Sequence, residues 1–169
     1  EITALPPLLD YEVEIGLVVL RPFSAAQLSS PNFAPPLGFF VANDLTARIL
    51  IGMAPEFTET VSYLAEGKGL PGFLPVGEKA FVPDQPEVDG WVCVEMKTEV
   101  NGEIRQQASS TDIIYSPRAI LKAVAERESI TRFESHDWII TGTPPGVALQ
   151  TPAWLQRALL LLDPPAETK

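Results

Sequence analysis

The sequence predicts a mostly β protein of the α+β class, folded as one domain over residues 1–169. The 17 prolines and 11 glycines punctuate the chain closely, which favours short strands and turns over long helices. Residues 91–100 alternate between apolar and polar side chains, a pattern typical of a strand with one buried face. Hydrophobic residues make up 46% of the chain and charged residues 20%, which fits a globular domain with a core.

Apolar runs and turn residues predict the strands. Asn101 and Gly102 both tolerate a positive φ, so they predict a tight hairpin turn. The prolines and glycines of residues 142–146 predict a rigid turn after the last strand. The expected strands are residues 11–20, 37–42, 91–100, 103–108 and 138–141.

One helix has a clear start in the sequence. Ser116 suits the N-cap and Pro117 the first helical position, and Ile120, Leu121 and Val124 then fall on one helical face. Other short segments compatible with a helix are residues 43–48, 60–65 and 154–162.

The charge balance excludes several classes of partner. The 22 acidic residues outweigh the 12 basic ones and give a formal charge of −10, so we expect no electrostatic binding to nucleic acid or anionic lipid. No apolar run approaches the ~20 residues that a membrane helix requires. The single cysteine, Cys93, excludes an internal disulfide, and a cytoplasmic location is the default expectation.

A pair of glutamates interrupts the first apolar run. Side chains alternate along a strand, so Glu12 and Glu14 point to the same face. Two carboxylates this close repel each other, and burying either without a partner is costly. A divalent metal would compensate both charges, because hard cations prefer oxygen ligands. The alternative is a strand with one solvated face, which is common.

A third carboxylate follows the second apolar run. Asp44 comes directly after residues 37–42, where it can close a metal site from a neighbouring strand. Three carboxylates with water or substrate oxygens make a reasonable shell for Mg²⁺ or Mn²⁺. The alternative role for Asp44 is that of a helix N-cap.

Four further polar residues are candidates for chemistry. Lys68, flanked by glycines, can reach a substrate carboxylate or remain a solvated loop lysine, and Arg48 has the same two interpretations. The hydroxyl of Thr143 can hold a carboxylate or a developing oxyanion, or can bond its own backbone in the turn. His136, the single histidine, is either a general base or a surface loop residue.

In this order and spacing, the segments resemble the C-terminal catalytic domain of the fumarylacetoacetate hydrolase family over residues 9–147. No single motif decides the resemblance, whereas the ordered set is specific. The matching pieces are residues 10–14 (DYEVE), 38–48 (GFFVANDLTAR), 67–68 (GK), 75–77 (PVG), 100–103 (VNGE) with Gln106, 110–112 (STD) and 137–147 (DWIITGTPPGV).

The resemblance implies a compact mixed β-roll or β-sandwich with short helices. It implies that Glu12, Glu14 and Asp44 bind Mg²⁺, with Mn²⁺ or Ca²⁺ as alternatives. It also implies that Lys68 and Thr143 are catalytic and bind substrate, and that Arg48 lines the substrate pocket. The expected partner is a small-molecule carboxylate substrate, and most family members are homodimers.

The first functional expectation from the resemblance is a metal-dependent hydrolase that cleaves a C–C bond in a β-diketo acid or acylpyruvate-type 2-oxo acid. The alternatives are a 2-oxo acid decarboxylase, a dienoate isomerase or hydratase, and a degenerate member that binds metal without catalysis. Family hydrolases carry a His–Glu pair on a lid upstream of the glutamate strand. Because this chain opens close to that strand, we expect its domain to lack the lid segment. Ile49 and Pro71 also depart from the family pattern.

Overall fold

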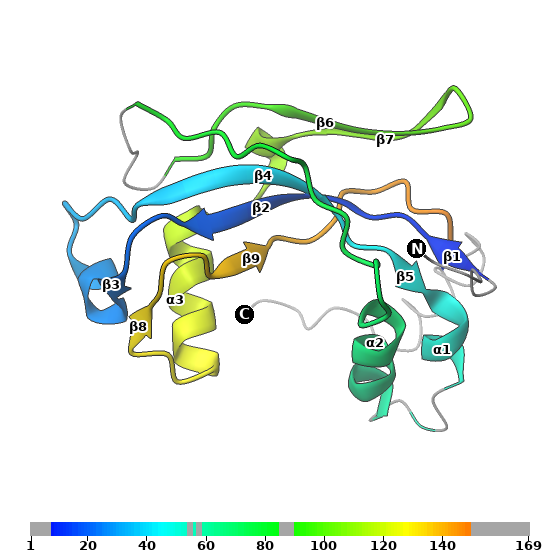
Figure 1. Cartoon of the computed structure of the whole chain (residues 1–169), viewed down its shortest axis with the longest axis horizontal. Coiled ribbons are helices and arrows are strands. Elements are labelled where there is room, and N and C mark those ends of the chain that lie inside the picture. Colours follow the sequence, from blue (N-terminus) through cyan, green and yellow to red (C-terminus); the bar gives the residue numbers. More distant parts are fainter. Residues whose placement is uncertain (1–7, 54–55, 57–58, 85–89, 150–169) are drawn as a thin grey trace, which may run out of the picture.

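A three-stranded antiparallel sheet forms the centre of the computed structural model, which describes residues 8–53, 56, 59–84 and 90–149 (Figure 1). Its strand order is β4-β2-β9. The strands are β2 (Val13–Val19), β4 (Leu37–Asn43) and β9 (Trp138–Ile140). The mostly β fold predicted from the sequence is confirmed.

Among the described residues, three two-stranded sheets and three α-helices surround the central sheet. The hairpin of β6 (Glu95–Val100) and β7 (Glu103–Ser109) lies along one side of it, and the helices lie on the other side (Figure 1). No described helix has the length of a membrane span, since the longest has 11 residues. The remaining elements are β1 (Leu9–Asp10) with β5 (Thr46–Ala47), β3 (Phe23–Ser24) with β8 (Arg132–Phe133), α1 (Arg48–Gly52), α2 (Thr60–Lys68), α3 (Pro117–Arg127), and the 3₁₀ helices η1 (Ala25–Ser29) and η3 (Ser110–Asp112).

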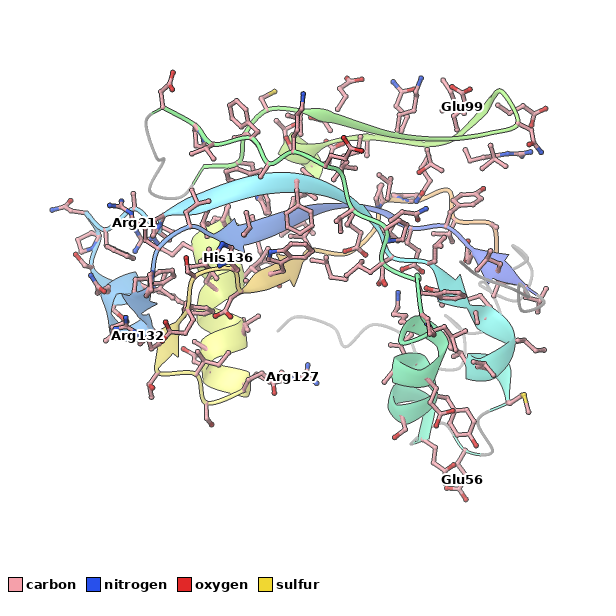
Figure 2. The ribbon with its side chains drawn as sticks, viewed as in Figure 1. Arg21, Glu56, Glu99, Arg127, Arg132 and His136 are labelled. Atoms are coloured by element: carbon pink, nitrogen blue, oxygen red, sulfur yellow. The ribbon has the colours of Figure 1, made fainter. Side chains whose placement is uncertain are left out.

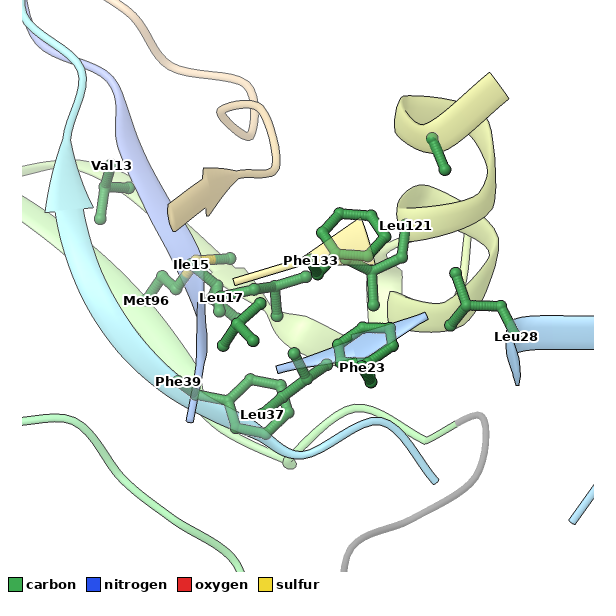
Figure 3. Close-up of a cluster of buried hydrophobic side chains, with 12 residues drawn as sticks. Val13, Ile15, Leu17, Phe23, Leu28, Leu37, Phe39, Met96, Leu121 and Phe133 are labelled. Atoms are coloured by element: carbon green, nitrogen blue, oxygen red, sulfur yellow. The ribbon is translucent and has the colours of Figure 1, made fainter. Parts of the chain in front are cut away.

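Strand β2 separates an apolar core from a charged face. Val13, Ile15 and Leu17 project into a cluster that also takes side chains from β3, β4, β6, α3 and β8 (Figure 3). Side chains alternate along the strand, so Glu14 projects to the opposite face. Glu14 therefore lies on the face of β2 that points away from the main core, and the packing of the core holds this strand in register.

Three predicted elements form as the local sequence requires. Asn101 and Gly102 have φ values of 54° and 81°, and they join β6 to β7 as the predicted hairpin turn. Ser116 caps α3 by accepting a hydrogen bond from the Ala119 N–H at 3.2 Å. The rigid turn after β9 also forms, with positive φ at Gly142 and Gly146.

Several predicted boundaries were wrong. The first strand is broken, because β1 ends at Asp10 and β2 begins only at Val13. Residues 43–48 do not form one helix: Asn43 ends β4, Thr46 and Ala47 form β5, and α1 begins only at Arg48. Residues 91–94 lie outside β6, while α2 continues to Lys68 beyond the predicted segment 60–65. The predicted helix at residues 154–162 lies outside the described residues.

A close contact between β2 and β4 limits the size of the residue at position 16. The ring of Phe40 lies over Gly16, and a Cβ at Gly16 would fall well under 3.0 Å from that ring. Phe40 in turn packs against Trp138 of β9, with ring centroids 5.0 Å apart. The missing side chain at Gly16 therefore lets the aromatic ring lie flat on β2.

We predict that Gly16→Ala lowers the free energy of unfolding by about 1–3 kcal/mol, because the added methyl group displaces the Phe40 ring. Urea denaturation measures the change. Gly52→Ala is the matched control: nothing lies within 4 Å of a Cβ there, so its effect should stay within about 0.5 kcal/mol. Equal stabilities for the two variants would contradict the close packing.

Candidate metal centre

Three buried carboxylates meet on the charged face of β2. One ligand oxygen from each of Glu12, Glu14 and Asp44 lies within 4.8 Å of the others. Antiparallel pairing of β2 with β4 sets Val13 opposite Asn43, which places Glu12 and Asp44 side by side just beyond the strand ends. The Asp44 N–H then donates to the Glu12 carbonyl at 2.8 Å. The glutamate pair is therefore not a solvated strand face.

Side chains around the cluster fix its backbone. The Asn43 side-chain oxygen accepts the Glu12 N–H at 2.9 Å, and the Thr46 hydroxyl donates to the Asp44 carbonyl at 3.1 Å. Asp44 does not cap a helix, because α1 begins at Arg48 and its N-cap, Ala47, makes no side-chain cap bond. The N-cap interpretation of Asp44 is therefore wrong, and its carboxylate faces the two glutamates.

Lys68 reaches the cluster from the last turn of α2. Its ammonium donates to Glu12 Oε2 at 2.8 Å, to the carboxylate of Asp44, and to the Thr46 hydroxyl at 3.0 Å. Lys68 is therefore not a solvated loop lysine. The helix approaches β5 closely at the preceding residue, where a Cβ on Gly67 would lie 3.1 Å from the Ala47 carbonyl oxygen.

Arg48 joins the cluster to a fourth buried carboxylate, that of Asp10. Its Nε donates to Asp10 Oδ2 at 2.8 Å, and its Nη2 donates to the carboxylate of Glu12. Asp10 is only 1% exposed and also accepts the Ala148 N–H at 2.6 Å. Sequence reasoning gave Asp10 no role, although it continues the two-residue spacing of Glu12 and Glu14.

The charges of this group do not balance. Among the described residues, four carboxylates (Asp10, Glu12, Glu14, Asp44) meet two cations (Arg48, Lys68), so a formal charge of −2 is uncompensated. Glu14 carries most of the imbalance, because it is 2% exposed and no described cation forms an ion pair with it. A divalent cation has the charge that this cluster lacks.

The imbalance also shows in the pKa values. Burial raises the pKa of the Glu14 carboxyl above its ordinary value, the charges of Asp44 and Glu12 add to this, and the Gly142 N–H opposes it. Burial lowers the pKa of the Lys68 ammonium, but its hydrogen bonds to Asp44 and Glu12 outweigh burial, so the pKa of Lys68 is raised overall. Lys68 is therefore held in its charged form.

The type of the candidate ligand atoms and their separations are compatible with a hard divalent cation. All three candidate ligands are carboxylates, as Mg²⁺, Mn²⁺ and Ca²⁺ prefer. Oxygens on opposite sides of Mg²⁺ are ~4.2 Å apart and those on opposite sides of Ca²⁺ ~5 Å. The three carboxylate oxygens lie within 4.8 Å of one another, close enough to be brought onto one such ion.

The turn after β9 lies against the cluster. Gly142 donates its N–H to Glu14 Oε2 at 2.8 Å, which places the half-buried Thr143 next to this carboxylate. The side chain of Gln106 in β7 donates to the Thr143 hydroxyl at 2.8 Å. Gln106 belongs to the sequence motif described above, but its contact with Thr143 was not foreseen.

His136 lies away from the carboxylates. Its backbone N–H donates to the Val19 carbonyl at 2.8 Å, at the opposite end of β2 from Glu14. Five residues of strand separate these two positions by roughly 17 Å. The side chain is exposed, on the side of the molecule where Arg21 lies (Figure 2). The surface interpretation of His136 fits this position.

Known proteins are similar to this chain in sequence. A family model described as fumarylacetoacetate (FAA) hydrolase C-terminal matches residues 3–158. The chain is 31% identical to the oxaloacetate tautomerase YisK of Bacillus subtilis, over 82% of this chain and 42% of that protein. It is 30% identical to a mitochondrial oxaloacetate decarboxylase of Dictyostelium discoideum, over 82% of this chain and 59% of that protein.

A solved structure shares the fold. The crystal structure of 2-hydroxyhepta-2,4-diene-1,7-dioate isomerase from Mycobacterium marinum superposes with a TM-score of 0.60 at 28% identity, over 86% of this chain and 51% of that one. This chain therefore spans about half the length of the relatives it matches.

We predict that Glu14→Gln stabilises the metal-free protein and removes its stabilisation by Mg²⁺. The substitution takes a buried charge out of a group of like charges, and the amide oxygen still accepts the Gly142 N–H. The unchanged protein should gain about 2.7 kcal/mol at a Mg²⁺ concentration 100 times its Kd. Thermal melting with Mg²⁺ and with chelator measures both effects.

The control is Glu99→Gln on the exposed hairpin, which should leave the response to Mg²⁺ unchanged (Figure 2). An equal Mg²⁺ response in the Glu14→Gln variant and the unchanged protein would remove Glu14 from the proposed metal site.

Proposed function

The chain belongs to the fumarylacetoacetate hydrolase family, and we propose that it is an enzyme that uses a divalent metal, Mg²⁺, to act on a small 2-oxo acid. One observation carries this proposal: four buried carboxylates keep a formal charge of −2 after Arg48 and Lys68 are counted, and the turn that carries Thr143 bonds one of them, Glu14, through the Gly142 N–H. In the proposal, Glu12, Glu14 and Asp44 hold the metal. Lys68, Thr143 and Arg48 are the residues proposed to face the substrate.

The metal would supply Lewis-acid polarisation of the carboxylate and carbonyl oxygens of a 2-oxo acid. Lys68 contributes a positive charge where negative charge develops on the substrate. Its three N–H groups bond Glu12, Asp44 and Thr46, so an N–H would turn to the substrate carbonyl oxygen once the metal takes over a carboxylate. The Thr143 hydroxyl can hold a substrate carboxylate. Arg48 stabilises the site by compensating the negative charges of Asp10 and Glu12, and 21% of its side chain is exposed.

The reaction we favour is keto–enol tautomerisation or decarboxylation of an oxaloacetate-like acid. Tautomerisation moves one proton between the carbon next to the carbonyl and the carbonyl oxygen, so it requires charge stabilisation and one proton-carrying group. Lys68 supplies the stabilising charge, and it would carry the proton once the metal takes over Glu12 and Asp44, whose hydrogen bonds raise its pKa. The names of the two curated relatives support this choice.

Hydrolytic cleavage of a C–C bond in a β-diketo acid, the first expectation from the sequence, is the second candidate. The description of the matching family model favours it. A cavity of about 700 Å³ also favours it, because Glu14 lines this cavity together with apolar side chains that suit an acyl group, including Phe40, Phe81 and Met96. A dienoate isomerase and a non-catalytic metal-binding protein are the remaining alternatives.

Three expectations from the sequence stay predictions. Sedimentation tests whether the protein is a homodimer, and imaging of a tagged protein tests the cytoplasmic location. The mass of the native polypeptide tests whether the catalytic domain is accompanied by a lid.

We predict that Lys68→Met lowers kcat/KM for oxaloacetate about 100-fold or more, because the variant loses both the charge and the proton at that position. Ultraviolet absorbance follows the enol, and coupled assays follow pyruvate from oxaloacetate or from an acylpyruvate. The matched control is Lys122→Met, a partly exposed lysine of α3 outside this cavity, which should keep its activity.

Each outcome selects one candidate. Loss of the enol without pyruvate indicates tautomerisation, and pyruvate from oxaloacetate indicates decarboxylation. Pyruvate from an acylpyruvate indicates hydrolysis. Thermal stabilisation by Mg²⁺ without turnover of either compound would contradict the proposed enzyme and favour the non-catalytic alternative.

A further inference from the structure

Gln106 is a buried amide whose hydrogen-bonding groups are all used. It is 1% exposed in β7, and a buried polar side chain is costly unless it is fully bonded. Its Oε1 accepts from the Val13 N–H at 3.1 Å and from the Thr98 hydroxyl at 2.9 Å. Its Nε2 donates to the Thr143 hydroxyl at 2.8 Å and to the Pro144 carbonyl at 2.9 Å.

Two of these partners fix the orientation of the amide. The Val13 N–H can only donate, so it must face the oxygen of Gln106. The Pro144 carbonyl can only accept, so it must face the nitrogen. The group facing Thr143 is therefore an N–H donor, and the alternative amide orientation would lose both backbone bonds.

The register of the sheet explains why the Gln106 side chain lies between Val13 and Thr143. β2 pairs with β9 at Gly16↔Ile140, and continuing that antiparallel register would set Val13 opposite Thr143. The chain instead leaves the sheet at Gly142, which has a φ of 95°. The amide of Gln106 is inserted between Val13 and Thr143 and bonds to both.

This insertion determines the role of the Thr143 hydroxyl. Its oxygen accepts from Gln106, and an amide nitrogen cannot accept the threonine proton in return. Within the described part of the chain, the Thr143 hydroxyl donates no hydrogen bond. The hydroxyl can therefore donate its proton to a group that enters beside Glu14, next to which Gly142 holds the turn.

We propose that Gln106 is a positioning residue that holds Thr143 as a hydrogen-bond donor to a carboxylate or carbonyl oxygen of the substrate. The inference rests on the proposed function, because it takes a 2-oxo acid as the ligand. Gln106 also bonds Val13, the residue between Glu12 and Glu14, so one side chain ties the threonine to the glutamate strand.

The test measures binding rather than turnover. Oxalate carries adjacent oxygens like those of a 2-oxo acid, and calorimetry measures its Kd in saturating Mg²⁺. Thr143→Val removes the donor at nearly constant volume and should weaken oxalate binding about tenfold or more. Thr143→Ser keeps the hydroxyl and should bind within about threefold of the unchanged protein.

A double-mutant cycle then tests the role of Gln106. Gln106→Met keeps the length of the side chain and loses its hydrogen bonds, so it should weaken oxalate binding in the presence of Thr143. In the Thr143→Val background the same substitution should have little further effect. The matched control is Gln107→Met, the neighbouring exposed glutamine of the same strand.

The outcomes separate this inference from the proposed function. If the unchanged protein binds neither Mg²⁺ nor oxalate, both fail. If it binds both ligands, but the effects of Gln106→Met and Thr143→Val on Kd multiply, Gln106 does not act through Thr143 and the inference alone fails. If Gln106→Met does not fold, the Thr143 variants still decide, because oxalate binding unchanged in Thr143→Val would overturn the role of the hydroxyl as donor.

Discussion

The face of β2 that carries Glu14 cannot exist without compensation for buried negative charge. Asp10, Glu12, Glu14 and Asp44 are each at most 6% exposed. In the interior, carboxylates at such short separation repel strongly unless cations or N–H donors lie between them. The chain supplies these from segments far apart in sequence: a lysine at the end of α2, an arginine at the start of α1, and backbone N–H groups of residues 142 and 148.

The sequence predicted the parts of this site that depend on local rules. Strand alternation placed Glu12 and Glu14 on one face, and the end of the next apolar strand placed Asp44 near them. The segment after Asp44 was misread as compatible with a helix, since its polar residues are bonded by tertiary partners that no local pattern contains. Thr46, for example, is fully buried because it bonds both Lys68 and the Asp44 backbone.

Asp10 and Gln106 show why the rest of the site could not be predicted. The partners that bury each of these polar residues lie far away along the chain. Asp10 bonds Arg48 and Ala148, while Gln106 bonds Val13 and Thr143. The burial of such residues becomes evident only when the positions of β2, β7 and the turn after β9 relative to one another are known.

The reach of Lys68 depends on a residue that makes no polar contact with the site. Gly67 is buried between α2 and β5, with room for little more than a hydrogen atom opposite the Ala47 carbonyl. A Cβ there would also lie 3.3 Å from the Ile51 side chain, so any larger residue would push α2 away from β5 or displace Ile51. A lysine side chain is flexible. The close packing of α2 on β5 nevertheless fixes where the Lys68 backbone lies relative to the carboxylates.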